Sequence, residues 1–423
     1  MRGLIWALTA CAALLAAPAM GQAYVIHAGA VLADAGGEPS GPSTIFVEDG
    51  RITGIAAGFQ QGGAQAELID LADKTVLPGL IDLHVHLTGD PGGDYRQGTV
   101  DTDEYDTLVG AKNARITALA GFTTVREAGS GESTAFALRR AISEGLIPGP
   151  RIIAAGPPLS IVGGHGDVTG FRPEILDLFA NPFACTGAVE CAEKVRRAAQ
   201  RGSDVIKITA TGGVLSQQGR GLGAHFTDAE MKSIVDTAHS LGLKVMAHAH
   251  GARGIEAASR AGIDTIEHST FIDEAAARAM KANGTVLVPT LMAFKGVSEG
   301  LGKGVYTPVV EEKIRAVYDQ AQVFMGQAYR WGVPIAFGTD AGVFAHGRNA
   351  EEFALMRAQG MSDREALASA TTIAAQVLDM EGEIGRLAEG YSADIIAVDG
   401  NPLEDVSVLE NVDFVMVRGR VIE

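Results

Sequence analysis

Positive charge is scarce in this sequence. Its 34 Lys and Arg residues stand against 51 Asp and Glu, which gives a formal net charge of −17 at pH 7. No stripe of basic residues interrupts the acidic excess. Proteins that bind nucleic acid neutralise phosphates with Lys and Arg, so this balance argues against a nucleic-acid partner.

Long hydrophobic runs are also scarce, and the most prominent one lies at the start of the chain. The first 23 residues, MRGLIWALTACAALLAAPAMGQA, join one Arg to an apolar stretch and then to small residues, which is typical of a secretory signal peptide. A transmembrane anchor is an alternative, but the apolar stretch at 4–20 is short and no basic residue follows it directly. A lipoprotein modified at Cys11 is another alternative. We expect residues 1–23 to be a signal peptide, the protein to be periplasmic or secreted, and no segment to span the membrane.

Cysteine is rare, with three residues in the chain. Cys11 leaves with the predicted signal peptide, and Cys185 and Cys191 remain within CTGAVEC. In an oxidising compartment this pair can close a short disulfide loop, and two buried free thiols are the alternative. A metal site is less favoured because the neighbouring sequence offers no further His or Cys to complete four ligands.

Both ends of the remaining chain are rich in short predicted strands. Residues 24–75 and 381–423 contain apolar runs separated by Gly, Pro, Ser and Asp, as at the predicted hairpin turn 48–50. Neither segment can bury a face alone, so we expect the two to pair into one small β-sandwich domain.

Residues 76–380 alternate apolar runs with helical patterns. The eight runs are TVLPGLIDLHVHL, FTTVREAG, RIIAAGPPLS, DVIKITATGG, KVMAHAHG, DTIEHSTF, TVLVPTLMAF and PIAFGTDAG. Strands this apolar are buried on both faces, as in parallel sheets. Eight strand–helix units predict an α/β fold with a (β/α)8 TIM-like barrel. An open doubly wound sheet fits less well, because it has fewer strands and a glycine-rich nucleotide turn.

Polar residues recur where the predicted strands end, which in a barrel is the rim that carries the active site. They are His84 and His86 on the first strand, Lys207 on the fourth, His248 and His250 on the fifth, His268 on the sixth and Asp340 on the eighth. Residues two apart on a strand share a face, so His84 and His86 point the same way.

Each of these residues alone has an ordinary structural explanation. A buried His usually has a hydrogen-bond partner, Asp340 could cap the next helix, and the head of Lys207 could reach solvent. Together, imidazole and carboxylate groups indicate a site for divalent metal ions, with Zn²⁺ favoured and Mn²⁺, Co²⁺ and Fe²⁺ as alternatives. A carbamate on Lys207 would turn a costly buried cation into an anionic ligand with two oxygens.

The motifs PGLIDLHVHL, EHST and GTDAG resemble those of the amidohydrolase superfamily, specifically its binuclear members with a carboxylated lysine. The resemblance covers nearly the whole chain after residue 23, including EGEIGRLAEGYSADIIAVD near the C-terminus. It implies two divalent ions. The implied ligands are His84, His86 and Asp340 for the first ion, His248 and His268 for the second, and Lys207, carboxylated by CO2, for both.

The resemblance also implies the catalytic roles. Asp340 would act as general base and then as general acid. His250 would lie above the metals, against the scissile carbonyl or the substrate. His250 in place of His248 is an alternative metal ligand, because both residues have the same parity on their strand.

Four further residues near the predicted rim are candidate substrate contacts. His165, in the glycine-rich GGHGD, follows the third strand, where a ligand can approach closely. His225 and His346 follow the fourth and eighth strands, with a place on the loop surface as the alternative. Arg126 ends the second strand and could bind a substrate carboxylate, or could pair with Glu127 or another acid.

The motifs GGHGD, KITATGG, AHAHG and IEHST resemble the branch that contains bacterial Xaa-Arg/Lys and Xaa-Pro dipeptidases and ochratoxin amidases. This branch implies attack of a metal-bridging hydroxide on an amide and release of a C-terminal L-amino acid from a dipeptide or an N-acyl-L-amino acid. It also implies a homo-oligomer such as an octamer. The alternative is a cyclic-amide or lactone hydrolase of imidazolonepropionase type, which uses one metal and needs no carboxylated lysine. A catalytically silent structural homologue is an alternative of another class.

Overall fold

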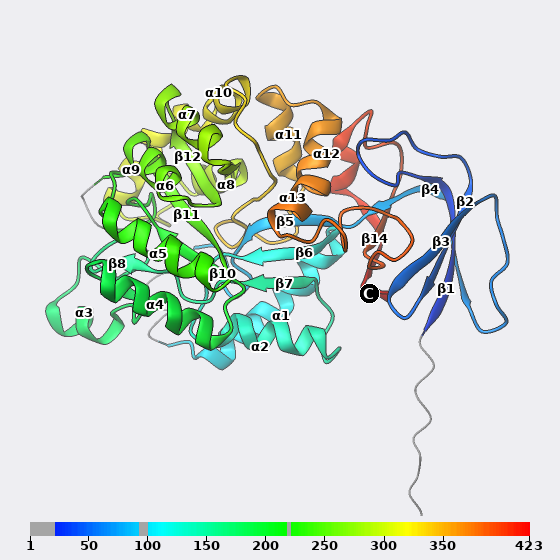
Figure 1. The fold of residues 1–423 in the computed structure, drawn as a ribbon, viewed down its shortest axis with the longest axis horizontal. Coiled ribbons are helices and arrows are strands. Elements are labelled where there is room, and N and C mark those ends of the chain that lie inside the picture. Colours follow the sequence, from blue (N-terminus) through cyan, green and yellow to red (C-terminus); the bar gives the residue numbers. More distant parts are fainter. Residues whose placement is uncertain (1–21, 93–99, 218–220) are drawn as a thin grey trace, which may run out of the picture.

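The computed structural model describes residues 22–92, 100–217 and 221–423 (Figure 1). The predicted signal peptide lies outside the described residues except for its last two positions. Among the helices in the described ranges, none has the length and hydrophobicity needed to cross a membrane.

The two ends of the chain form one mixed sheet beside the barrel (Figure 1). Its strands are β1 (Ala23–Val31), β2 (Ser43–Glu48), β3 (Arg51–Ala57), β4 (Glu67–Pro78), β14 (Ile395–Val398), β15 (Val412–Val417) and β16 (Arg420–Val421). All seven are hydrogen-bonded in the order β16-β15-β14-β4-β1-β2-β3. The antiparallel pairing of β14 with β4 joins the C-terminal segment to the N-terminal one. Buried residues of this sheet, such as Ile26, Ile45 and Ile395, form a hydrophobic cluster of their own.

The barrel strands are parallel and mostly buried. They are β5 (Leu80–Val85), β6 (Phe122–Glu127), β7 (Arg151–Ala154), β10 (Val205–Thr209), β11 (Lys244–Gly251), β12 (Thr265–Phe271) and β13 (Val286–Val288), followed by the extended segment 334–341. They run as two hydrogen-bonded groups, β5-β6-β7 and β10-β11-β12-β13.

Single backbone bridges close the barrel between these two groups. Leu159 pairs with Ile208, and at the other seam the segment 334–341 bridges β13 through Leu287 and β5 through Val85. The amide of Asp340 donates to the carbonyl of His84 at 2.7 Å, which fixes the eighth segment against the first strand. The predicted α/β barrel with a β domain built from both chain ends is therefore confirmed.

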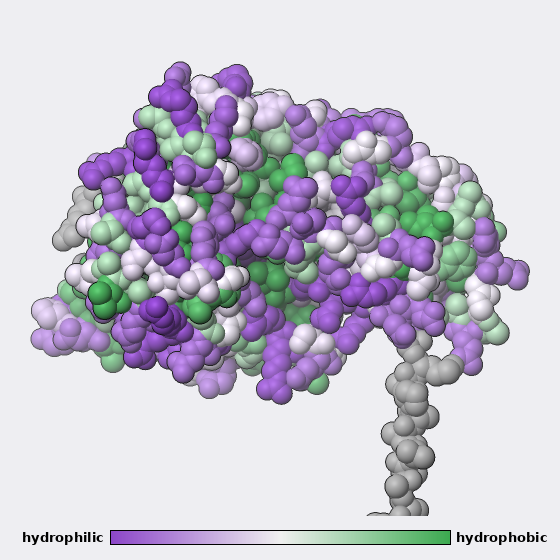
Figure 2. All heavy atoms as spheres, in the orientation of Figure 1, coloured by the Kyte–Doolittle hydropathy of each residue, from purple (hydrophilic) through white to green (hydrophobic). Residues whose placement is uncertain are grey.

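Helices surround the barrel (Figure 1). They are α1 (Asp103–Leu119), α2 (Thr134–Ser143), α3 (Pro173–Phe179), α4 (Ala188–Arg201), α5 (Asp228–Ser240), α6 (Ala252–Ala261), α7 (Glu274–Asn283), α8 (Leu291–Glu299), α9 (Pro308–Ala321), α10 (Phe324–Arg330), α11 (Glu351–Ala358), α12 (Asp363–Ser369) and α13 (Thr372–Val377). Helix α5 shows why they form: a capping box between Thr227 and Glu230 begins it, and Met231, Ile234 and Val235 are buried. Hydrophilic residues cover most of the outer helices on the face shown in Figure 2.

A disulfide joins Cys185 of β9 (Ala184–Cys185) to Cys191 of α4. Both residues are fully buried, and β9 pairs with β8 (Ser160–Ile161) in the segment that follows the third barrel strand. The bond therefore ties the start of α4 to this segment.

Replacing both cysteines with Ala is expected to lower the free energy of unfolding by about 2 kcal/mol, because the unfolded chain regains the entropy of a short loop. Thermal or urea unfolding of the purified protein measures this. As a control, a reducing agent should destabilise the wild type and leave the double variant unchanged. A double variant as stable as the oxidised wild type would show that the bond contributes nothing to stability.

Candidate active site

Strained backbone gathers at the C-terminal rim of the barrel. Four of the seven described non-glycine residues with positive φ lie there: His268 (φ 71°), Ser269 (φ 61°), Thr290 (φ 51°) and Asp340 (φ 64°). Such conformations cost about 1–3 kcal/mol each, and they persist where the surrounding structure holds them in place. The strand ends are thus bent to aim particular side chains inward.

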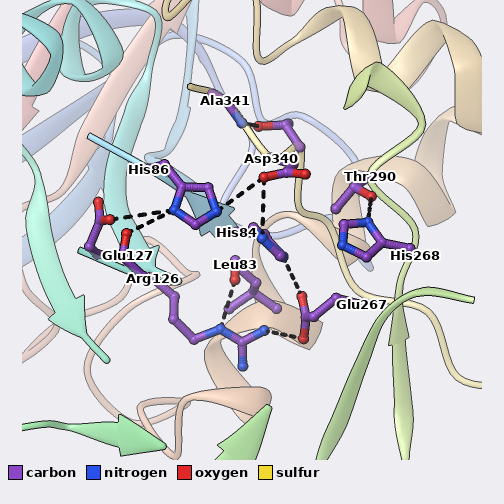
Figure 3. A network of polar contacts seen from close by, with 12 residues as sticks. Leu83, His84, His86, Arg126, Glu127, Glu267, His268, Thr290, Asp340 and Ala341 are labelled. Atoms are coloured by element: carbon purple, nitrogen blue, oxygen red, sulfur yellow. Dashed lines mark hydrogen bonds and ion pairs between the residues drawn. The ribbon is translucent and has the colours of Figure 1, made fainter. Parts of the chain in front are cut away.

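His84, His86 and Asp340 meet across the seam between the first strand and the eighth segment (Figure 3). Asp340 Oδ1 lies 3.4 Å from His84 Nε2 and 3.2 Å from His86 Nε2. This oxygen is buried, and among the described residues no donor reaches it with hydrogen-bond geometry. These three groups converge but do not form good hydrogen bonds with one another. Such an arrangement fits a cation shared between them.

Four histidines of the site are held by their Nδ1 atoms. Nδ1 contacts Glu267 Oε2 in His84 (2.8 Å), the carbonyl of Gly129 in His86 (2.9 Å), Thr270 Oγ1 in His250 (2.7 Å) and Thr290 Oγ1 in His268 (2.6 Å). Metal-binding histidines typically use one ring nitrogen in this way and offer the other to the ion. His248 has the opposite arrangement, because its Nε2 contacts the carbonyl of Gly212 at 3.2 Å, which leaves Nδ1 for a ligand.

The imidazoles form one buried cluster. The ring centre of His248 lies 4.5 Å from that of His250 and 4.6 Å from that of His268, and the centre of His84 lies 5.4 Å from that of His268. Potential ligand atoms of His84, His268 and Asp340 all lie within 4.8 Å of one another. This His/His/Asp cluster fits a metal site.

Lys207 enters the same cavity from β10, where its sequence neighbours Ile206 and Ile208 are also buried. Lys207 is 5% exposed, and within the described residues no carboxylate lies within ion-pair distance of its ammonium. Burial lowers the pKa of Lys207 to about 8, although the charges of Glu267 and Asp340 act in the opposite direction. The neutral amine is the form that reacts with CO2, so this environment suits carboxylation.

A buried ion pair supports the site from below (Figure 3). Arg126 donates to the carbonyl of Leu83 at 2.7 Å and to Glu267 Oε1 at 3.1 Å, while the other oxygen of Glu267 faces His84. Burial raises the pKa of Glu267, but the charge of Arg126 and the bond to His84 outweigh it and keep the carboxyl ionised. Arg126 thus lies beneath the cavity, a position that favours the ion-pair alternative over a contact with substrate. Its partner is Glu267 and not Glu127.

The sequence patterns did not point to two supporting acids, Glu267 and Asp82. Asp82 is fully buried and bonds Thr339 Oγ1 at 2.6 Å and Asn349 Nδ2 at 2.8 Å, and it also accepts the amide of His84 at 3.0 Å. It therefore links the first strand to the eighth segment just below His84 and Asp340. A signal was present, since Asp82 lies two residues before His84 on the same strand face and Glu267 directly precedes His268.

A second support runs through α8, whose first residues follow Thr290. Glu352 of α11 accepts the amides of Leu291 at 2.8 Å and Met292 at 2.6 Å, which fixes the N-terminus of α8. Thr290 precedes that helix and bonds His268. A buried acid on a distant helix therefore positions a histidine of the site.

Replacing Thr290 with Val is expected to weaken metal affinity by about 10–100-fold, because His268 loses the partner of its Nδ1 while the β-branched shape stays. Competition with a chelator measures the affinity. Thr285→Val is the matched control, since Thr285 is equally buried and bonds Ser259 and Ile263 away from the site. Equal metal affinity in the two variants would remove the supporting role of Thr290.

The cavity has a volume of about 420 Å³ and an apolar wall. The side chains of its polar floor are His84, His86, Lys207, His248, His250, His268 and Asp340. Its wall includes Val214, Leu215, Ala293, Phe294, Val297 and Val343. Phe294 stands edge-on to His250, with 6.2 Å between ring centres. Such a wall excludes water from the reacting groups and leaves room for a small molecule.

The remaining predicted histidines divide into two groups. His165 and His250 line the cavity, and burial lowers the pKa of each to about 3, so both rings are neutral at physiological pH. His225 lies behind His165, with its Nδ1 3.4 Å from the His165 amide. His346 contacts Thr117 Oγ1 at 3.4 Å and the carbonyl of Gly89 at 3.1 Å. Neither His225 nor His346 lines the cavity, so their role as substrate contacts stays a prediction.

A (β/α)8 barrel with histidines, a lysine and an aspartate around one cavity at its C-terminal rim is the architecture of metal-dependent hydrolases. Residues 75–422 match the family model of the amidohydrolase family. The chain therefore belongs to the amidohydrolase family, as the motifs predicted, and is an amide hydrolase.

Individual relatives are similar over most of their length. An ochratoxinase from Aspergillus niger is 32% identical over 411 residues, which cover 91% of this chain and 83% of the relative. An imidazolonepropionase from Ectopseudomonas mendocina is 27% identical, over 83% of this chain and 85% of the relative. The structure of a Xaa-Pro dipeptidase with methionine bound in its active site is 38% identical. It superimposes with a TM-score of 0.89 over 95% of this chain and all of that one.

Proposed function

We propose that this protein is a binuclear metal-dependent amidase that releases a C-terminal L-amino acid from dipeptides or N-acyl-L-amino acids. The observation that carries the proposal is that several imidazoles converge on the buried Asp340 and Lys207. One ring nitrogen of each imidazole is held by a protein partner, which leaves the second nitrogen for a metal ion. Similarity to an ochratoxinase and to a Xaa-Pro dipeptidase supports an amide with a free carboxylate as substrate. An imidazolonepropionase-type reaction is less favoured, because Lys207 lies among the proposed ligands.

The residues present fit two divalent ions, for which Zn²⁺ suits the nitrogen and oxygen ligands best. His84, His86 and Asp340 would hold one ion and His248 and His268 the other, with Lys207, carboxylated by CO2, shared between them. When bound, such ions lower the pKa of a water and polarise the scissile carbonyl.

Asp340 would move the proton of this reaction. Burial raises the pKa of Asp340, but the charges of His84 and His86 outweigh it and hold the pKa well below its usual range. The carboxylate is therefore ionised at neutral pH and can take a proton from the attacking water. It would then pass the proton to the leaving amine nitrogen. His165 and His250 are neutral and can donate a ring N–H to the carbonyl oxygen.

The apolar wall favours an apolar side chain beside the scissile bond. Among the described residues that line the cavity, Asp340 is the only carboxylate, and the metal site uses it. A Lys or Arg side chain would therefore be buried without a partner for its charge, which is costly. We infer a preference for leaving groups such as Phe, Leu or Met.

Export and assembly complete the proposal. The N-terminal sequence and the disulfide support a periplasmic or secreted protein. Exposed apolar side chains in the segment 160–189, including Val162, Leu178 and Val189, support assembly into a homo-oligomer.

Metal content of the purified mature protein and hydrolysis of N-acyl-L-amino acids with Phe, Pro, Leu, Lys and Arg leaving groups test the proposal together. About two ions per chain with cleavage of some substrates is expected. One ion per chain without amide cleavage would reject the proposal in favour of a cyclic-amide or lactone substrate.

A further inference from the structure

A second cavity, of about 370 Å³, lies at the junction of the mixed sheet and the barrel. Arg151, which lines it, is the first residue of β7, so this cavity opens at the end of the barrel opposite the active site. The side chains that matter here are Arg51, Arg151, Arg418, Arg420, Glu383 and Ser392. In a chain with a net charge of −17, four arginines around one cavity are a local reversal of sign.

Two hairpin turns from opposite ends of the chain build the wall. Asp49 and Gly50 connect β2 to β3 with φ of 51° and 77°, and Arg418 and Gly419 connect β15 to β16 with φ of 52° and 74°. Positive φ at both central residues is typical of tight hairpins. The turns touch backbone to backbone: a Cβ on Gly419 would lie 2.5 Å from the Cα of Gly50. Glycine is therefore required at Gly419, and Arg418 is held in place by this contact.

Two of the arginines are neutralised. Arg51 donates to both oxygens of Glu383, at 3.0 and 3.2 Å. Arg151 donates to Ser392 at 3.0 Å and to Asp394 at 3.2 Å. The Nε of Arg151 is buried and, among the described residues, has no acceptor.

The other two arginines keep their charge. In the described part of the chain, neither Arg418 nor Arg420 has a carboxylate within ion-pair distance, and Arg420 reaches only the carbonyl of Ile142, at 3.5 Å. Partial burial lowers the pKa of Arg418, and the charges of Arg151 and Arg420 lower it further, while the charges of Asp394 and Glu383 act in the opposite direction. Asp49, the remaining carboxylate of the cavity, is exposed to solvent, as are Arg418 and Arg420.

We propose that this cavity binds a small multivalent oxyanion of the phosphate type, held by Arg418 and Arg420 beside Arg151. Planar guanidinium groups match the geometry of phosphate oxygens, and an anion between them relieves their repulsion. The ligand would connect both chain ends to the barrel, so it stabilises the fold without entering the active site. A phosphate group on a lipid offers the same chemistry as free phosphate.

Calorimetric titration of the metal-loaded enzyme with inorganic phosphate, against chloride at equal ionic strength, tests the proposal. The wild type is expected to show saturable binding, and the Arg418→Ser/Arg420→Ser variant to bind roughly tenfold more weakly or worse, with unchanged amidase activity. The matched control is Arg172→Ser/Arg278→Ser, which removes two exposed arginines elsewhere. Phosphate bound at the metal site would persist in all variants. Equal binding by the wild type and the Arg418→Ser/Arg420→Ser variant, or no binding by the wild type, would overturn the proposal.

A second arm identifies the source of the anion. Sedimentation with phosphatidylglycerol vesicles that the Arg418→Ser/Arg420→Ser variant abolishes would support a lipid headgroup as the ligand. Phosphate binding without vesicle binding would support the free ion.

Discussion

Replacing Asp340 with Asn should lower kcat by about 10³-fold or more, because in the proposed mechanism this one side chain combines metal ligation with proton transfer. Its Oδ1 lies between His84 and His86, and the amide would keep the shape while losing the charge and the ability to take a proton. Asn is also among the few residues that adopt the left-handed backbone found at Asp340, so the strand end should keep its bend.

Steady-state kinetics with a cleaved N-acyl-L-amino acid, together with metal content, measure the effect. Asp379→Asn is the matched control, because Asp379 has a similar φ of 55° but is exposed. It pairs with Lys244, the first residue of β11, at the end of the barrel opposite the active site. That control should keep wild-type kcat. An Asp340→Asn enzyme with wild-type kcat would remove Asp340 from the mechanism.

The fold was predictable because local patterns and global architecture agree. The apolar runs that contain His84, Lys207, His248 and His268 are strands buried on both faces, and such strands occur in few architectures. A histidine or lysine in such a run needs a partner for its polar group, so it stands out in the sequence. For the same reason the polar floor of the cavity could be predicted from the sequence.

The supporting residues were less predictable because they act across space. Glu352 lies 62 positions beyond Thr290, yet it fixes the helix that Thr290 precedes. Arg126 ends a strand like the predicted ligands, but its side chain turns below the cavity to meet Glu267. The position of a residue along a strand gives the face on which its side chain lies. It does not give the direction of a long side chain, which depends on the partners that the side chain finds.

The apolar wall also escaped prediction, since Val214, Leu215, Phe294 and Val297 look like ordinary core residues in the sequence. They come from the loop after β10 and from α8, and only the fold brings them to one cavity. We expect these residues to act on selectivity: in the proposed function the polar floor cleaves the amide bond, and the apolar wall selects the side chain beside it.

Replacing Val297 with Asp should therefore change the preferred leaving group. Val297 is 4% exposed and lines the cavity from α8. A carboxylate there would face an apolar side chain at a cost and would offer a buried partner to Lys or Arg. We expect kcat/KM for an N-acyl-Phe substrate to fall by about 10–100-fold, and the ratio of Lys to Phe cleavage to rise by about 100-fold.

Val297→Asn separates charge from shape in this experiment. The amide has the same size as the acid and disrupts the apolar wall equally, so it should reduce Phe cleavage without a gain for Lys. If the Asp and Asn variants show the same ratio of Lys to Phe cleavage, the wall does not select by charge, and the side chain of the leaving amino acid must lie elsewhere. If only the Asp variant gains Lys cleavage, the side chain next to the scissile bond contacts α8, and the apolar character of that helix sets the natural preference.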